Sequence, residues 1–407
     1  MAASPTTGRE SMLAELNQLR ANTDALFAAL RPEAIYARAI PERHRLIFYL
    51  GHLEAFDWNT ICRRTLGMES FHPSFDTLFE AGIDPPEGQL PADGPEAWPR
   101  VEEVLDYNGR VRREVDRVFD TAPREVAVCA LEHRLMHAET FAYLLHNLDA
   151  EDKPGICPDT PIEGAPWQPE FISIPGGTAT LGQAPGEFGW DNEFERHTAR
   201  VPEFSIGRYK VTNGEYLRFV EDGGEVPYYW TRQGSGWFYR GMRGLIPLPS
   251  DWPVYVTHEQ AEAYARYHGA TLPTEAQFHR AAFGTPSGGE RSYPWGEGEP
   301  AAGRGNFDFH RWDPVPVTAT PEGDSAFGVA QMVGNGWEWT STVFGPFDGF
   351  RTFSFYPGYS KNFFDGEHFV LKGGSPRTGA RLLRRSFRNW FRRRYPYMYA
   401  TFRLVRG

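Results

Sequence analysis

The sequence predicts an α+β protein, with an N-terminal four-helix bundle followed by a loop-rich domain of short strands. Up to about residue 150, apolar residues recur at intervals of three and four, the spacing of a buried helix face. Beyond Pro154, the segments become short and are punctuated by Gly-Gly, Pro-Gly and Asn-Gly pairs, which is typical of irregular structure. We therefore predict two domains, residues 1–153 and 154–407.

Four helical stretches are expected in the first domain. Their count is that of an up-and-down bundle, whose core accepts ligands that point inward. The expected helices span residues 9–30, 37–66, 95–121 and 123–148. Residues 71–95 are expected to form a long connection, and residues 149–169, rich in proline, glycine and acidic side chains, a linker.

The net charge and the cysteine content indicate which partners and which cellular compartment to expect. The formal net charge of -11 gives no overall attraction to nucleic acid or to an anionic membrane, so neither partner is expected. The three cysteines Cys62, Cys129 and Cys157 fit neither a disulfide framework nor a zinc knuckle, which favours a reducing compartment. No stretch has the length of a membrane span and the N-terminus is polar, so we expect a cytoplasmic protein.

Three histidines form a candidate metal site. His133 and His137 are four residues apart on the fourth expected helix and therefore project from the same face, and His52 on another helix can supply a third ligand. The alternative is that these are hydrogen-bonded core histidines. A zincin site is disfavoured because its glutamate position holds Arg134.

Carboxylates fit poorly as further ligands of this site. Glu132 and Glu139 lie off the face shared by His133 and His137, and Glu54 lies off the face of His52. An all-histidine triad of neutral nitrogens leaves several coordination positions open. Such a site suits Fe(II) that must take both a substrate and O2.

The second half of the chain resembles the formylglycine-generating-enzyme fold, which is related to C-type lectins. Six segments in the right order support this resemblance: Val211–Tyr216, Leu272–Ala276, Tyr293–Gly296, Met332–Thr340, Leu371–Ser375 and Phe402–Arg403. Formylglycine generation itself is disfavoured, because that activity relies on cysteines in this domain and none occurs after Cys157.

The two halves together resemble the ergothioneine-type sulfoxide synthases. The resemblance rests on a DinB-like bundle with this histidine pattern, followed by a formylglycine-generating-enzyme-like half that carries the segment Phe188–Glu193. The resemblance implies a nonheme iron enzyme that uses O2, with Fe(II) bound by His52, His133 and His137. It also implies that hercynine, the Nα-trimethyl derivative of histidine, is a substrate. The alternative of plain core histidines is less favoured in this context.

The resemblance also assigns roles in the second half. Asn389 and Trp390 lie in the segment that binds the trimethylammonium group of hercynine, a group that an indole face can hold. Tyr356 is the first candidate for the catalytic tyrosine, and Tyr359 is the second, as a substrate contact. The alternatives are a buried aromatic for Trp390 and ordinary loop tyrosines for the other two.

Three positions depart from the pattern of family members that use γ-glutamylcysteine. Phe391 and Tyr395 replace an aspartate and an arginine that hold the charged donor, and Met136 replaces a glutamine next to His137. A donor without that zwitterion is expected, and a sugar suits the aromatic faces. These departures resemble the selenoneine synthase branch, which joins hercynine to a selenosugar by oxidative C–Se bond formation.

Other functions stay open at this point. A C–S bond-forming synthase with a thiol donor is the alternative within the family, and a DinB-type thiol transferase is an alternative among enzymes. A lectin-like binding protein with a structural metal bundle is the non-enzymatic alternative. The arginine-rich stretch from Arg377 to Arg394 invites a nucleic-acid function, but an internally salt-bridged or solvated set fits the acidic total better.

Overall fold

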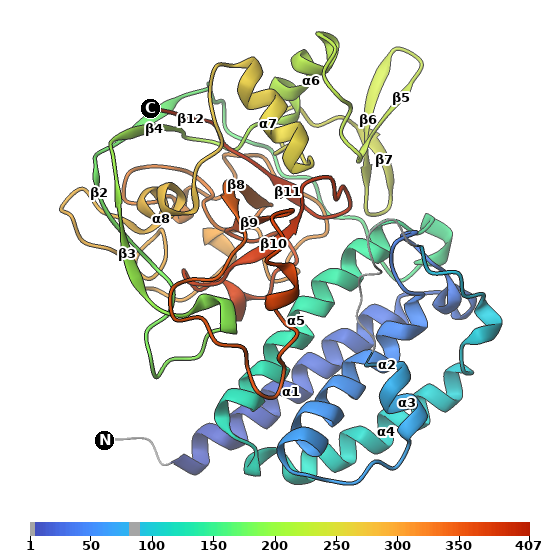
Figure 1. Ribbon diagram of the computed structural model, residues 1–407. Helices are drawn as coiled ribbons and strands as arrows, with labels where there is room; N and C mark the ends of the chain where they lie inside the picture. The colour runs from blue at the N-terminus through green and yellow to red at the C-terminus, as the bar shows by residue number, and fades with distance from the viewer. Residues whose placement is uncertain (1–4, 81–89) are drawn as a thin grey trace. The chain divides into compact units, whose positions relative to one another are not determined.

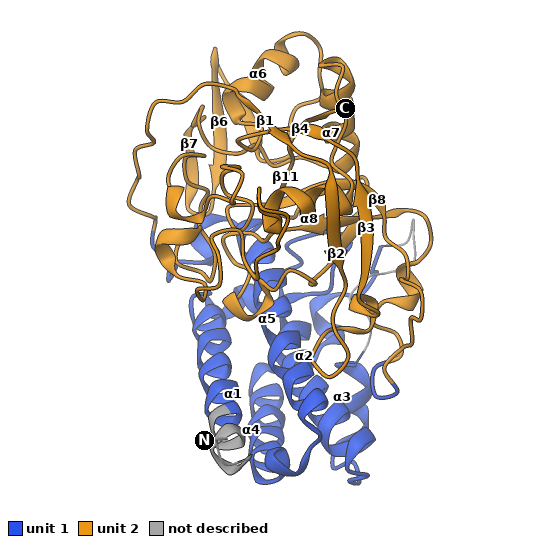
Figure 2. Ribbon diagram, turned by 90° about the vertical axis from the view of Figure 1, so that its left-hand side faces the viewer, with its two compact units in different colours: residues 1–157, 354–356 blue, residues 158–353, 357–407 orange. Residues whose placement is uncertain are grey.

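The computed structural model describes residues 5–80 and 90–407, with side chains of the first helix described from Met12 onward. The chain forms two compact units, coloured separately in Figure 2. The first comprises Met1–Cys157 together with the short segment Ser354–Tyr356, and the second comprises Pro158–Phe353 and Pro357–Gly407. The helical first part and the sheet-containing second part confirm the predicted α+β class.

The first unit is a helical bundle, whose long helices lie side by side (Figures 1 and 2). Its helices are α1 (Pro5–Ala28), α2 (Leu46–Asp57), α3 (Pro73–Leu78), α4 (Val101–Val118) and α5 (Arg124–His146). Short 3-10 turns occur at Pro32–Tyr36, Pro95–Ala97, Phe119–Thr121 and Ala150–Asp152. A π-helical segment, Trp58–Thr65, continues α2.

The structure corrects two predictions: where the second helix begins, and what the connection after it contains. The helix begins at Leu46 and not at residue 37, because Pro41 lacks a backbone N–H and disfavours helical geometry in the residue before it. The predicted connection over residues 71–95 contains the short helix α3, which begins at Pro73. Residues 81–89 of that connection lie outside the described residues.

Helices α2 and α5 form the interior of the bundle. Every residue from Leu46 to Asp57 is buried, and so are most residues of α5. A helix that is covered all round places even its polar residues inside the protein, which is why histidines on both helices are buried. In the part of the chain that the structure describes, no helix combines the length and the apolarity needed to cross a bilayer.

The second unit consists of small sheets joined by irregular loops. Its strands are β1 (Phe171–Ile174), β2 (Gly177–Leu181), β3 (His197–Val201), β4 (Phe204–Gly207), β5 (Trp230–Gln233), β6 (Gly236–Gly241), β7 (Gly244–Pro247), β8 (Trp337–Val343), β9 (His368–Lys372), β10 (Asn389–Arg392), β11 (Ala400–Thr401) and β12 (Val405–Arg406). Its helices are α6 (Asn213–Glu221), α7 (His258–Tyr267) and α8 (Glu275–Phe283).

The strand order of these sheets is known from their pairing. The largest sheet has the order β10-β9-β8-β11, and the others are β1-β4-β12, β5-β6-β7 and the pair β2-β3. Strands β10 and β9 pair in antiparallel fashion, with Asn389 opposite Leu371 and Phe391 opposite Phe369. This register fixes the faces of the sheet on which the residues of β10 lie.

The sequence segments that identify the second domain have structural roles. Thr212 and Thr274 each cap a helix and form a capping box with the residue three positions on. Asn335 has a positive φ of 61°, and its side chain bonds the backbone of Val315. Glu338 is fully buried and pairs with Lys210 at 2.9 Å and with Arg403 at 2.8 Å. These segments therefore stabilise the fold.

Candidate metal centre and substrate-binding residues

The structure brings the three predicted metal ligands together inside the bundle. One ligand atom from each of His52, His133 and His137 lies within 4.8 Å of the others, and the two Nε2 atoms of His52 and His137 are 3.2 Å apart. Two nitrogens bound at right angles to one ion, each about 2.1 Å from it, are about 3.0 Å apart. The spacing therefore suits ligands of a shared ion.

Burial keeps the three imidazoles neutral. Each is less than a tenth exposed, and this burial lowers the pKa of His52 to about 4 and the pKa values of His133 and His137 well below the ordinary value. A neutral imidazole has a free nitrogen lone pair, which a metal ligand requires. At neutral pH no proton has to leave these side chains before a metal binds.

The hydrogen bonding of the triad also fits a metal. Among the described residues, neither ring nitrogen of His133 has a hydrogen-bond partner, and the same holds for Nδ1 of His137. Buried polar atoms without partners are costly, so a core histidine is expected to be hydrogen-bonded. A metal ion coordinated by the triad would remove part of this cost.

Phe56 and Tyr356 lie beside His133. The ring of Phe56 stacks on His133 with a centroid distance of 3.4 Å and an interplanar angle of 8°. The ring of Tyr356 is half-buried, with its centroid 5.2 Å from Phe56 and 6.3 Å from His133. Sequence reasoning missed Phe56, although its position four residues after His52 places both on one helix face.

Charged residues close to the triad in the chain form a buried ion network. Arg134, next to His133 in the chain, pairs with Glu54 at 3.1 Å and with Asp57 at 2.8 Å, and all three side chains are about 1% exposed. Glu54 also pairs with Arg112 at 2.7 Å. Glu54, which the sequence disfavours as a metal ligand, is therefore paired with arginines of two neighbouring helices.

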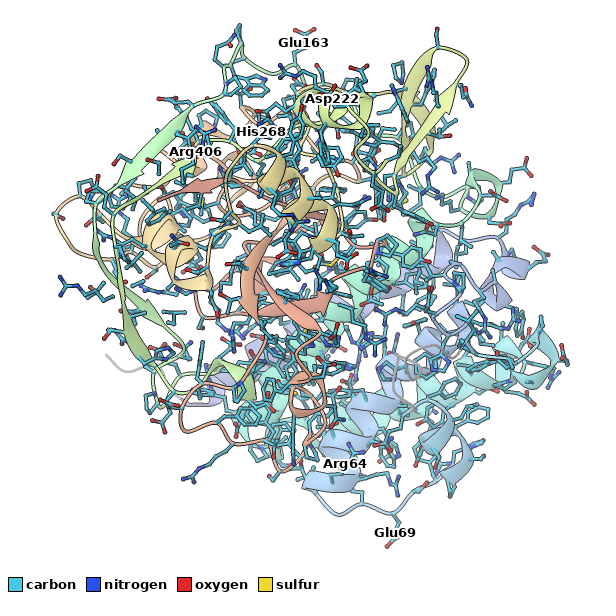
Figure 3. All side chains as sticks on the ribbon, turned by 45° about the horizontal axis from the view of Figure 1, so that its top comes forward. Arg64, Glu69, Glu163, Asp222, His268 and Arg406 are labelled. Atoms are coloured by element: carbon cyan, nitrogen blue, oxygen red, sulfur yellow. The ribbon has the colours of Figure 1, made fainter. Side chains whose placement is uncertain are left out.

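The chain leaves α2 through the π-helical segment Trp58–Thr65. Helical π-turns are rare and occur often at functional sites. Arg64 near the end of this segment and Glu69 in the loop beyond it are both exposed, as Figure 3 shows. Arg64 forms an ion pair with Glu80.

The predicted hercynine-binding residues lie in the second unit as part of an aromatic group. Trp390 stacks on Phe344 at 4.2 Å, and Tyr359 meets it edge-on at 5.2 Å. Tyr359 stacks in turn on Trp190 at 4.0 Å. The side-chain oxygen of Asn389 accepts a hydrogen bond from the backbone N–H of Trp390 at 2.9 Å. Trp390 is half-buried, so part of its surface is accessible.

The two residues that depart from the family pattern form a separate pair. Phe391 and Tyr395 stack with a centroid distance of 5.0 Å and an interplanar angle of 24°, and both are half-buried. Phe391 follows Trp390 on β10, and successive strand residues point to opposite faces. The structure therefore separates the indole of Trp390 from the Phe391 pair, and by the same alternation Asn389 lies on the face of Phe391. Met136 is half-buried on α5, beside His137 in the chain.

The arginine-rich stretch is largely paired with carboxylates, as the salt-bridged interpretation predicts. Arg377 is fully buried and lies over the ring of Tyr399 at 4.0 Å. The ion pairs of the other members are Arg384 with Glu193, Arg385 with Glu290, Arg388 with Glu275, Arg393 with Glu259 and Glu262, and Arg394 with Glu259. For these five arginines the internally salt-bridged set is confirmed.

Comparison with known protein families matches both halves of the chain. A model of the DinB superfamily matches residues 15–146, and a model of the sulfatase-modifying factor enzyme 1-like domain matches residues 160–407. The chain is thus a two-domain protein with a DinB-type bundle and a sulfatase-modifying-factor-type domain.

Curated relatives define the family more closely. The hercynine oxygenase of Mycolicibacterium smegmatis is 35% identical over an alignment that covers 70% of this chain and 73% of that protein. The hercynine oxygenase of Mycolicibacterium thermoresistibile is 34% identical, over 78% of this chain and 77% of that protein. Ergothioneine biosynthesis protein 1 of Neurospora crassa is 27% identical, over 93% of this chain and 55% of that protein. The chain belongs to the family of these hercynine oxygenases, the ergothioneine-type sulfoxide synthases.

Proposed function

We propose that the protein is an Fe(II)- and O2-dependent enzyme that forms a C–Se bond between imidazole C2 of hercynine and a selenosugar, a step toward selenoneine. Family membership and the buried histidine triad support the iron-dependent oxidative chemistry. The stacked pair Phe391 and Tyr395 supports a donor without the charged amino-acid group. By resemblance, family members that use γ-glutamylcysteine hold it with charged residues at these two positions. The alternative within the family is a thiol donor and C–S bond formation.

The chain's own residues have distinct tasks in this proposal. His52, His133 and His137 would hold Fe(II), which when bound activates O2 and brings hercynine and the selenol together. Phe56 keeps the ring plane of His133 in place by stacking on it. Tyr356, whose ring lies near those of Phe56 and His133, would donate a proton or a hydrogen atom from its phenol to the reacting group.

In the second unit, aromatic side chains would bind the two substrates. A quaternary ammonium group has no N–H to donate, so the indole of Trp390 suits the trimethylammonium group of hercynine. Asn389 lies on the other face of β10 and would support this contact through the hydrogen bond between its side-chain oxygen and the backbone N–H of Trp390. The faces of Phe391 and Tyr395 suit the C–H surface of a sugar ring. Neither residue offers the charge pair that a zwitterionic donor requires.

A donor competition tests the proposal. The purified protein is loaded with Fe(II) without oxygen and then given hercynine and O2 with either 1-seleno-glucose or γ-glutamylcysteine. We expect consumption of O2 and a product with a C–Se bond, identified by mass spectrometry, with the selenosugar. Exclusive turnover of γ-glutamylcysteine would refute the selenium assignment, and bound zinc without any O2 consumption would favour a binding protein.

The double substitution Phe391→Asp with Tyr395→Arg is expected to shift donor preference toward γ-glutamylcysteine. A charge-assisted hydrogen bond contributes about 1.5–3 kcal/mol, so restoring the pair should raise the ratio of kcat/KM values for the two donors by about 10- to 100-fold. The control is Arg232→Asp, which makes a comparable change of charge at an exposed position of another sheet. An unchanged ratio in the double variant would remove these positions from the donor site.

The substitution Tyr356→Phe is expected to leave iron binding intact and to slow turnover by about 100-fold or more, because general acid–base catalysis contributes about 10²–10⁴-fold. Removing one hydroxyl keeps the ring and therefore its contacts with Phe56 and His133. Iron content, circular dichroism and O2 consumption measure the three effects separately. Loss of folding would instead indicate a structural role, and a larger loss in Tyr359→Phe would make Tyr359 the catalytic tyrosine.

A further inference from the structure

The outer nitrogen of His52 is held by a backbone carbonyl. Nδ1 of His52 lies 2.6 Å from the carbonyl oxygen of Phe79, the residue that directly follows α3. A carbonyl oxygen only accepts hydrogen bonds, so Nδ1 must carry the proton and Nε2 has the free lone pair. Nε2 is the atom 3.2 Å from His137, so this hydrogen bond selects the tautomer in which His52 can bind a metal.

The ring of Phe79 occupies the space next to Gly51. A Cβ atom built on Gly51 would lie 2.5–2.6 Å from three ring atoms of Phe79, closer than any real contact. Gly51 lies inside α2, where glycine is a poor helix former, and Phe79 is fully buried. The missing side chain thus lets Phe79 approach α2 at the position directly before His52.

A second set of contacts fixes α3 independently of Phe79. Asp76 is fully buried, and its carboxylate accepts hydrogen bonds from Trp58 at 3.0 Å, Tyr107 at 2.8 Å and Ser70 at 2.6 Å. These donors come from the π-helical segment, from α4 and from the loop before α3. The carbonyl of Phe79 is therefore presented by a helix that is held on several sides.

We propose that Gly51 and Phe79 are positioning residues of the metal centre. Phe79 docks on the bare backbone of Gly51, and this contact brings its carbonyl to Nδ1 of His52 and directs Nε2 toward His133 and His137. The inference rests on the proposed metal site. It adds that α3, a helix with no ligand of its own, sets the metal affinity of the triad.

Two matched glycine substitutions test this inference. In Gly51→Ala the added methyl group pushes Phe79 away and lengthens its hydrogen bond to His52. Loss of such an outer contact weakens metal binding by about 10- to 100-fold. In the control Gly109→Ala, on α4, the added methyl group meets one side-chain atom at an ordinary 3.6 Å. Gly109→Ala should bind metal as the unchanged protein does and melt at the same or a higher temperature.

The measurement uses the full chain without oxygen. Fe(II) affinity is determined by competition with a coloured chelator, and the absorption spectrum of the Co(II)-loaded protein reports the ligand geometry. Gly51→Ala should show both weaker binding and an altered Co(II) spectrum, a change that a general loss of stability does not produce. Adding Phe79→Leu, whose side chain has no ring and can rotate away from the methyl group, should restore affinity at least partly.

Three outcomes separate the possible failures. Unchanged Fe(II) affinity and Co(II) spectrum in Gly51→Ala would overturn the inference. Equal weakening in Gly51→Ala and Gly109→Ala would also overturn it, because the effect would then come from the helices in general. Failure of the unchanged protein to bind Fe(II) or Co(II) would instead overturn the proposed function on which the inference rests.

Discussion

Replacing His137 with alanine is expected to abolish iron binding and turnover together. The structure places His137 in a buried cluster with His52 and His133, and its removal leaves two nitrogens, too few to hold the ion in competition with water. Loss of an outer-shell partner alone costs about 10- to 100-fold in affinity, so loss of a ligand should cost more than about 100-fold. Iron content after anaerobic loading and O2 consumption with hercynine measure the two effects.

Thermal melting gives a second measurement of the same prediction. A ligand present at 100 times its dissociation constant stabilises a protein by about 2.7 kcal/mol. Added Fe(II) should therefore raise the melting temperature of the unchanged protein but not that of His137→Ala. The control is His146→Gln, a buried histidine on the same helix outside the cluster, which should keep the response. Retained iron with lost turnover in His137→Ala would show that His137 is not a ligand.

The triad was accessible to sequence analysis because helix geometry is regular. Residues four apart on a helix project together, so the pairing of His133 with His137 follows from the existence of one helix. The assignment of His52 needed the further assumption that its helix lies next to α5. Helical periodicity and glycine pairs likewise predicted the two kinds of structure, because those patterns are local.

Features that depend on irregular backbone were missed. Helix α3 is only six residues long, too short to show a periodic pattern, yet its following residue Phe79 provides the carbonyl that holds His52. A backbone carbonyl has no sequence signal at all. The two faces of β10 could also not be assigned from residue types, so the sequence did not show that Trp390 and Phe391 lie on opposite faces of this strand.

Buried charge was the other feature that sequence analysis could not predict. Glu54 and Arg134 look like ordinary surface residues, because charged side chains are seldom fully buried. They are buried because α2 and α5 are covered on all sides and because each charge meets an opposite charge on a neighbouring helix. Such pairing depends on the arrangement of several helices at once.

Replacing Arg134 with methionine is expected to destabilise the bundle by about 3–5 kcal/mol, the usual cost of removing one partner of a buried ion pair. Glu54 would keep Arg112 at 2.7 Å and Arg20 at 3.8 Å, but Asp57 would lose the hydrogen bond from Arg134 at 2.8 Å. A fall of about 6–20 °C in melting temperature corresponds to this loss for a domain of this size.

Two further variants show whether the unpaired carboxylate is the cause. Arg134→Met combined with Asp57→Leu should recover most of the lost stability, because replacing a whole buried ion pair by apolar residues is often neutral. Arg117→Met is the control, since Arg117 pairs with Glu114 on the surface and should contribute less than about 1 kcal/mol. A double variant no more stable than Arg134→Met would show that the packing of Arg134, and not its charge, stabilises the bundle.

The pH dependence of the Arg134→Met variant follows from Asp57. Burial raises the pKa of Asp57 above its ordinary value, and the charge of Arg134 is the largest effect that opposes this rise. Without Arg134 the pKa of Asp57 in the folded protein rises further, and the protonated carboxyl is the form that the bundle tolerates. In the unfolded chain Asp57 has its ordinary pKa of about 4, and in the folded variant its pKa is higher. The contribution of such a carboxyl to stability is fully present below the unfolded pKa and is lost as the pH rises through the folded pKa. The difference in melting temperature between the unchanged protein and Arg134→Met should therefore widen as the pH rises from about 4 to 7. A difference that does not depend on pH would show that Asp57 does not titrate in the folded variant.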